Sequence, residues 1–252
     1  MLNMRKHPVA VAALAGWLLT AAVQPSPVSA QDVTNAGVNF VEITDASRRS
    51  VQKGLAYLAQ SQQEDGSYGS NRFQRHVGIT SLACLAFMAD GHMPGRGEYG
   101  PNVQRGLDFV LDHATESGLI VADASHGPMY GHGFATLFLG EVYGMTGDEH
   151  TREALLKAVR LIVTTQNPEG GWRYQPRPFD ADISVTICQV MALRSARNAG
   201  LSVPKETIDR AIAYVRQCQN PADGGFKYML NSGGSAFPRS GRGCSAILCR
   251  GL

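Results

Sequence analysis

Apolar residues recur at helical spacing in four segments of similar sequence along the chain. These segments are residues 51–58, 103–110, 155–162 and 208–215, and their first residues lie 52, 52 and 53 positions apart. Each places apolar side chains at positions i, i+4 and i+7, as Val51, Leu55 and Leu58 do, which predicts an amphipathic helix with one buried stripe. Four nearly equal periods predict a repeat architecture.

A second kind of apolar segment follows each of the first three, at residues 77–89, 133–143 and 183–199. These segments are rich in small residues and nearly free of charge, which predicts helices buried on most sides. Glycine turns at Gly66, Gly118, Gly170 and Gly224 separate the two kinds of segment. The pattern predicts an all-α fold of helical hairpins of about 52 residues each, with the second helices inside and the first helices outside.

The repeats divide the chain into residues 47–98, 99–150, 151–203 and 204–252. The last repeat has no second apolar segment, because the segment at residues 240–252 is too short and contains three glycines. We therefore expect a partial ring with an incomplete last hairpin, and a truncated or frame-shifted end is our hypothesis for it. An open apolar edge of such a ring predicts self-association.

The first 30 residues have the pattern of a signal peptide. Arg5 and Lys6 precede an apolar run over residues 9–23, and Val28-Ser29-Ala30 resembles a cleavage site. We expect cleavage near Ala30, export to the periplasm or the medium, and a leader over residues 31–46 before the helical domain at 47–252. Without its first 30 residues the chain keeps 21 basic and 21 acidic side chains, so a nucleic-acid partner is not expected.

Five cysteines, an odd number, do not suggest a disulfide framework in a chain of 252 residues. Cys84 and Cys188 lie in apolar helical segments and are predicted to be buried thiols. No Cys-x-x-Cys pair occurs, which excludes a zinc ribbon and a thioredoxin motif.

The residues around the glycine turns resemble a known family. Terpenoid cyclases, including squalene cyclases, and the β subunits of protein prenyltransferases share a repeated pattern. It reads Lys/Arg-Gly/Ala, an aromatic-Leu pair, Gln, and Gly-x-Trp. The third repeat fits it with Lys157, Gln166 and Trp172, and the first and fourth repeats carry Tyr68 and Phe226 in place of the Trp.

The resemblance covers residues 48–240 and implies an α/α toroid. In this family the Gln and aromatic positions are structural ties between hairpins, which implies that role for Gln62, Gln166 and Gln219. A Gln amide near a helix end can also satisfy unpaired backbone groups of two segments at once. The second repeat departs from the pattern, because Ala114 and Ile120 stand where Gln and Trp belong.

Two carboxylates, Asp180 and Asp182, directly precede the third inner segment. Cyclases that protonate an alkene or an epoxide carry Asp-x-Asp-Asp-Thr in a similar place. By that resemblance Asp180 matches the first Asp, Asp182 the protonating one and Ser184 the Thr, whereas Ile183 replaces the last Asp. The same residues also suit a helix N-cap by Asp182 or Ser184, so both interpretations stay open.

Zinc is the second chemistry that the resemblance raises. Protein prenyltransferases hold the metal with an Asp, a Cys two residues later and a distant His. Here Asp180 would match the Asp, but Asp182 stands where the Cys belongs. His76, His126 and His132 lie near the starts of inner segments, and His76 and His132 are weak candidate ligands. Histidines at helix ends more often make ordinary hydrogen bonds, so we expect neither a metal nor another cofactor.

The function that the resemblance implies is cyclase/mutase-like or prenyltransferase-like, acting on an isoprenoid or other lipid. As an enzyme it would be an isomerase started by a general acid, with Asp182 as the acid and Asp180 as its supporting carboxyl. Protonation of an alkene creates a carbocation, which aromatic side chains would stabilise. The candidates are Phe87, Phe134, Phe138 and Tyr143 on inner helices, and Tyr130, Tyr174 and Phe179 on loops.

Two alternatives remain open. One is a non-catalytic exported scaffold that binds a protein, lipid or glycan, and the other is a polysaccharide-active α/α-toroid enzyme. An apolar, aromatic cavity with Asp182 pointing into it favours the cyclase, whereas a shallow polar face favours the alternatives.

Overall fold

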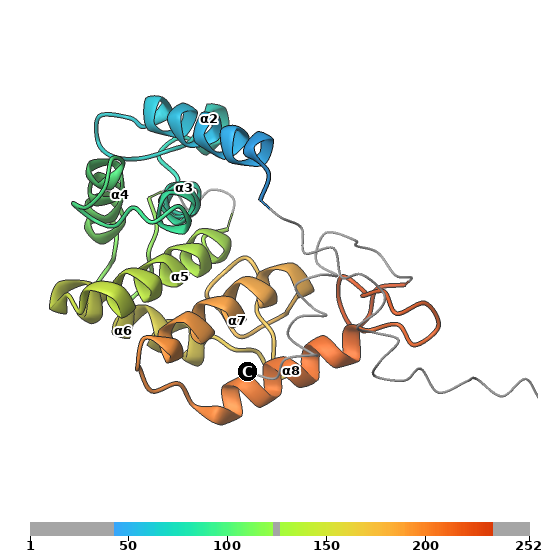
Figure 1. Ribbon diagram of the computed structural model, residues 1–252. Helices are drawn as coiled ribbons and strands as arrows, with labels where there is room; N and C mark the ends of the chain where they lie inside the picture. Colours follow the sequence, from blue (N-terminus) through green and yellow to red (C-terminus); the bar gives the residue numbers. More distant parts are fainter. Residues whose placement is uncertain (1–42, 123–126, 234–252) are drawn as a thin grey trace, which may run out of the picture. The chain divides into compact units, whose positions relative to one another are not determined.

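A computed structural model describes residues 43–122 and 127–233. The helices are α2 (Asp45–Ser61), η1 (Asn71–Phe73), α3 (Val77–Ala89), α4 (Gly100–Asp112), α5 (Met129–Thr146), α6 (Glu149–Thr164), α7 (Ile183–Asn198) and α8 (Lys205–Cys218) (Figure 1). Between them, the described ranges contain only isolated β-bridges, which confirms the all-α prediction. The predicted signal peptide, most of the leader and the end at 240–252 lie outside the described residues.

The helix boundaries follow the hydrophobic pattern closely. All four first segments lie within α2, α4, α6 and α8, and α3 begins and ends where predicted. Helix α5 begins at Met129, four residues before the predicted start at Gly133. It ends at Thr146, and the capping residue Gly147 adopts φ +67° and donates its N–H to the Tyr143 carbonyl at 2.9 Å. This left-handed cap is a common way to end a helix.

Three inner helices and three outer helices pack in a regular order. Helix α5 contacts both α3 and α7, while α4 packs on α3, α6 on α5 and α8 on α7 (Figure 1). Each of these outer helices therefore packs on the inner helix of the preceding hairpin. Eleven of the sixteen residues of α7 are buried, against five of sixteen in α6, which confirms the predicted inner and outer roles. These helices belong to one compact unit.

Burial keeps three cysteines as thiols. Cys84, Cys188 and Cys218 are buried and unbonded to one another, as predicted for the first two. Burial raises the pKa of Cys84 and of Cys188 to about 12, so neither is reactive at neutral pH. None of the described helices has the length and apolar character needed to cross a bilayer.

Candidate functional site

An apolar cavity of about 450 Å³ lies where α3, α5 and the loop after α6 meet. Its lining consists of Phe73, His76, Gly78, Ile79, Leu82, Gly127, Tyr130, Phe134 and Tyr174. Ile79 and Leu82 are large apolar residues on α3, yet they remain 36% and 45% exposed. The size and the mainly apolar, aromatic lining are typical of a site for a small organic molecule.

The structure places three of the predicted aromatic residues at this cavity. They are Tyr130, Phe134 and Tyr174. Phe87 and Phe138 are fully buried in the core instead, and Phe179 is 88% exposed. The expectation of inner-helix aromatics therefore holds for Phe134. Tyr130, expected in a loop, lies in the first turn of inner helix α5, and Tyr174 lies in the loop after α6.

Sequence reasoning missed Phe73, Ile79 and Leu82. Phe73 ends the short helix η1 in the loop before α3, and no repeat position marks it. Ile79 and Leu82 lie three residues apart, on one face of an inner helix that the pattern predicted to be buried. The signal for them appears only once α3 is placed against its neighbours, because an unusually apolar helix looks the same whether one face is open or not.

Asp182 is the N-cap of α7. Its Oδ1 accepts hydrogen bonds from the backbone N–H groups of Ser184 and Val185, both at 2.9 Å, and from Ser184 Oγ at 2.6 Å. Its own N–H donates to the Trp172 carbonyl at 3.0 Å, which ties the helix start to the loop. The capping interpretation of this residue is therefore correct, and it uses a single carboxylate oxygen.

The other carboxylate oxygen of Asp182 takes no part in the cap. Oδ2 is buried and has no hydrogen-bond partner among the described residues, and Arg173 Nε lies 3.9 Å from it. Arg173 forms its close ion pair with Asp180, whose side chain is 42% exposed. Asp180 is thus connected to Asp182 through Arg173, and the replaced position, Ile183, points into the core with no exposed surface.

A chain of hydroxyl groups links the cavity to Asp182. The Tyr130 hydroxyl hydrogen-bonds Ser184 Oγ at 2.5 Å, and Ser184 Oγ donates to Asp182 Oδ1. Burial, with a smaller contribution from the negative charge of Asp182, raises the pKa of Tyr130 to about 12 against the opposing effect of the Ser184 hydrogen bond. Tyr130 therefore keeps its proton at neutral pH. Asp182 itself does not line the cavity and has no exposed surface.

The two candidate metal ligands have other partners. His76 is the N-cap of α3, and its Nδ1 accepts from the N–H groups of Gly78 and Ile79. His132 is fully buried, and its Nδ1 accepts from the Ile120 N–H at 3.2 Å. In the described ranges no three His, Cys, Asp or Glu side chains come together as a metal site would require; His126 lies outside them.

His132 occupies a structural position that threonine takes in the other hairpins. Thr80 Oγ1 accepts from the Tyr68 N–H at 2.9 Å, and Thr186 Oγ1 accepts from the Trp172 N–H at 3.1 Å. All three acceptors lie in the first turn of an inner helix and hold the loop position that precedes it. Burial lowers the pKa of His132 to about 4, and the nearby Ala158 backbone opposes part of this shift. The ring is neutral at pH 7.

The contact between each loop and the next outer helix is called a junction below. The first junction joins the loop after α2 to α4, the second the loop after α4 to α6, and the third the loop after α6 to α8. At the third, Gln166 Nε2 donates to the carbonyls of Gly170 and Thr207, at 2.8 and 2.9 Å. Gln62 makes the same pair of bonds at the first, to Gly66 and Asn102. The family role of these glutamines as ties is confirmed in both places.

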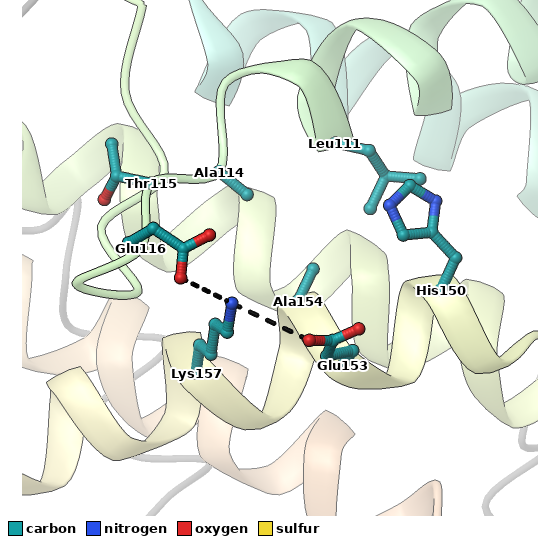
Figure 2. A pocket seen from close by; sticks show the side chains of 8 residues that line it. All are labelled: Leu111, Ala114, Thr115, Glu116, His150, Glu153, Ala154 and Lys157. Atoms are coloured by element: carbon teal, nitrogen blue, oxygen red, sulfur yellow. Dashed lines mark hydrogen bonds and ion pairs between the residues drawn. The ribbon is translucent and has the colours of Figure 1, made fainter.

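The second junction has a hollow in place of the glutamine tie. It is a polar hollow of about 200 Å³ lined by Leu111, Ala114, Thr115, Glu116, His150, Glu153, Ala154 and Lys157 (Figure 2). Ala114 stands at the Gln position, and Ala154 is the residue whose counterparts, Asn102 and Thr207, accept the Gln amide. Figure 2 shows Lys157 reaching Glu116 across this space, at 3.0 Å. The smaller side chain at position 114 therefore accounts for the hollow, and no ligand is needed to explain it.

The hairpin repeat, the glutamine ties and the layer of inner helices define an α/α toroid of the terpenoid cyclase type. Two structures of the type II terpene cyclase MstE from Scytonema match it. The complex of a variant with geranylgeranyl dihydroxybenzoate has a TM-score of 0.51 and 14% identity, covering 81% of this chain and 62% of that one. The apo enzyme has a TM-score of 0.52 and 17% identity, covering 80% and 57%.

A sequence relative agrees with the fold. The chain is 26% identical over 188 residues to drimenyl diphosphate synthase from Streptomyces showdoensis, a match that covers 73% of this chain and 33% of the relative. The chain thus spans about a third of that protein's length. No family model matches. In sequence and fold the chain is terpenoid cyclase-like.

Proposed function

We propose that the chain binds a linear isoprenoid in the 450 Å³ cavity and takes part in its cyclisation, with Asp182 as the protonating acid. The observation that supports this is the hydroxyl chain from Tyr130, which lines the cavity, through Ser184 to Asp182. The similarity to drimenyl diphosphate synthase and to a cyclase bound to geranylgeranyl dihydroxybenzoate supports an isoprenoid as the substrate class.

The proposed chemistry starts with proton transfer from Asp182 to an alkene carbon. The O–H bond of the carboxylic acid breaks and a C–H bond forms, which leaves a carbocation on the substrate and a carboxylate on Asp182. The three donors on Oδ1, together with Arg173 near Oδ2, would stabilise that carboxylate. This arrangement leaves Oδ2 to carry the proton.

The aromatic lining suits the other half of the reaction. Aromatic faces attract cations, and Phe73, Tyr130, Phe134 and Tyr174 surround the cavity. Because Asp182 is fully buried, the substrate would have to displace part of the wall to reach Oδ2. Tyr130 is the lining residue connected to Asp182, so its ring is the part that we expect to move.

A non-catalytic isoprenoid-binding protein is the second candidate. The burial of Asp182 and the replacement of the last family Asp by Ile183 favour it, since both make proton transfer into the cavity harder. We also propose export of the protein, on the basis of the signal-peptide pattern in residues 1–30. An exported protein would meet isoprenoids that have already crossed or left the membrane.

The Asp182→Asn variant tests the catalytic proposal. An asparagine side chain can still accept the cap hydrogen bonds, so the thermal midpoint should change by less than about 3 °C. Conversion of geranylgeranyl dihydroxybenzoate or other linear isoprenoids to cyclic products, followed by mass spectrometry, should disappear. Asp148→Asn is the matched control, because Asp148 caps α6 through the same kind of bond, to Thr151 at 2.7 Å, and is predicted to leave turnover unchanged.

Lipid extraction of the purified protein separates the two candidates. An isoprenoid that co-purifies with the wild type, together with turnover that Asp182→Asn removes, supports the enzyme. A bound isoprenoid without conversion of any tested substrate supports the binding protein. Absence of both bound isoprenoid and conversion contradicts the proposal in either form.

A further inference from the structure

Every junction depends on a glycine that touches the next outer helix. Gly66, Gly118 and Gly170 have φ of +84°, +88° and +99°. A Cβ added to them would lie 2.2, 2.3 and 2.3 Å from the carbonyl oxygens of Arg105, Lys157 and Arg210, respectively. These carbonyls occupy the same repeat position on α4, α6 and α8. Backbone contact of this kind leaves no room for any side chain, so it identifies the surface that receives an outer helix.

The fourth glycine has the same backbone conformation, but none of the described outer helices packs on it. Gly224 has φ +71°, but no described atom lies within 4 Å of the place where its Cβ would be. Gly66, Gly118 and Gly170 are buried, whereas Gly224 is exposed. The neighbouring glutamine changes in the same way, since Gln166 is 8% exposed and Gln219 is exposed. The loop at 219–226 therefore presents a receiving surface that the described residues do not fill.

Helix α2 is the counterpart, an outer helix on which none of the described loops packs in this way. Its Lys53 holds the repeat position of Arg105, Lys157 and Arg210, yet none of the described glycines packs on its carbonyl. Its apolar face is open as well. Tyr57 is 70% exposed, whereas Phe109 and Tyr214, at the same position of α4 and α8, are 3% and 0% exposed. In addition, nothing described lies within 4 Å of a Cβ built on Gly54.

We propose that the chain associates head to tail, with α2 of one copy docking on the 219–226 loop of a second copy. The contact would repeat the one made three times within each chain, with the Lys53 carbonyl of one copy against Gly224 of the other. Tyr57 would then pack beside Gly225, as Tyr214 packs against Gly171, whose added Cβ would lie 3.1 Å from the Tyr214 ring.

Charge supports the choice of a second copy as the occupant. In each internal junction the cation of the outer helix binds the preceding loop: Arg105 donates to Gln62 Oε1, Lys157 to Glu116 and Arg210 to the Asn167 carbonyl. Lys53 is the corresponding cation of α2, and its exposed position leaves it able to reach the partner's loop. Contacts between unlike faces build closed rings or open filaments, depending on the rotation between copies.

Sedimentation of the full chain over about a hundredfold range of concentration tests the association. We expect concentration-dependent assembly of the wild type. Gly224→Asn should weaken it by about tenfold or more, because asparagine tolerates positive φ but its Cβ would clash with the partner's carbonyl. Tyr57→Ser should weaken it similarly by removing the apolar contact. Neither position is covered by the described residues of its own chain, so circular dichroism should show both variants folded.

Mixing the two variants distinguishes head-to-tail contact from any other. Each variant alone is predicted to assemble more weakly than wild type, but one intact α2 and one intact 219–226 loop remain in the mixture, so a dimer of the two variants should form with the affinity of the wild-type contact. Met145→Ser, at a 57% exposed apolar residue on α5, is the control and should assemble like wild type. A wild type that stays monomeric throughout would overturn the proposal, as would assembly that the two substitutions do not weaken or a mixture that fails to associate.

Discussion

The second and third junctions follow one plan with different side chains. In both, the loop glycine lies so close to the next outer helix that an added Cβ would be 2.3 Å from a backbone carbonyl oxygen, that of Lys157 or of Arg210. In both, the loop residue before the inner helix donates its N–H to a side chain in that helix's first turn. The third junction adds a buried tie, Gln166, and the indole of Trp172, which donates to the Ile162 carbonyl at 2.7 Å.

The second junction lacks these additions and has a hollow and a surface ion pair. Glu116, which pairs with Lys157, is 96% exposed, and such pairs contribute at most about 1 kcal/mol. Yet α6 packs on α5 as α8 packs on α7. The difference teaches that the backbone contact sets the arrangement of the hairpins, and that the glutamine tie adds stability to an arrangement already determined.

The largest effect should come from the shared feature. Gly118→Ala and Gly170→Ala should each destabilise the fold by about 4 kcal/mol or more, because the Cβ meets a backbone carbonyl that cannot move aside. Urea unfolding measures this loss. Gly200→Ala is the matched control, since Gly200 has φ +91° but open space around it, and should cost only about 1 kcal/mol. A mild effect of Gly118→Ala alone would mean that the second junction is built differently.

A pH effect is expected from the buried histidine of the second hairpin. Burial lowers the pKa of His132 to about 4 in the folded protein, from the ordinary histidine value of 6.5 that applies to the unfolded chain. The unfolded chain therefore binds the proton more readily. Stability from this residue is complete above pH 6.5 and falls as the pH drops toward 4, by up to about 3 kcal/mol.

His132→Asn removes the titration but keeps an acceptor for the Ile120 N–H. The stability of the variant should therefore depend less steeply on pH between about 4 and 6.5 than that of the wild type. Urea unfolding at a series of pH values gives both curves, and replacing the exposed His150 by Asn provides the control. Parallel curves for wild type and His132→Asn would contradict the assignment of a neutral, buried ring.

Most of the fold could be predicted from the sequence, because it repeats. The period near 52 residues places all four outer helices, and the spacing from Lys157 to Gln166 and Trp172 marks the tie. The position of Asp182 directly before an apolar helix also predicted an N-cap, as one of two interpretations. These features depend on residues close together in the chain, where spacing determines contact.

The cavity and the environment of Asp182 depend on contacts far apart in the chain. Tyr130 meets Ser184 across 54 positions, and Phe73 lies in a loop outside the repeat. The role of His132 was hidden for another reason. His132 lies 12 residues after Ile120, as Thr80 lies 12 after Tyr68, but its acceptor is a ring nitrogen in place of a hydroxyl, and the third acceptor, Thr186, lies 14 residues after Trp172.

The smallest effects should come from exchanging the tie between the two junctions. Gln166→Ala removes the two buried hydrogen bonds that the Gln166 amide donates to the carbonyls of Gly170 and Thr207. It should lower the free energy of unfolding by about 2 kcal/mol. Ala114→Gln is the opposite change. The new side chain would enter the hollow of about 200 Å³ beside Ala154 (Figure 2), and its amide could donate to the carbonyls of Gly118 and Ala154.

Ala114→Gln should therefore stabilise the fold by about 1 kcal/mol, less than Gln166→Ala costs, because the hollow is open to water and its carbonyls are already solvated. Urea unfolding of the two single variants and of their combination measures both values. Because the junctions are separate, the two changes should add within about 0.5 kcal/mol. Ala114→Glu is the control, since it has the same length but no amide to donate to these carbonyls. If glutamate stabilised the protein as much as glutamine, filling of the hollow and not the tie would explain the gain.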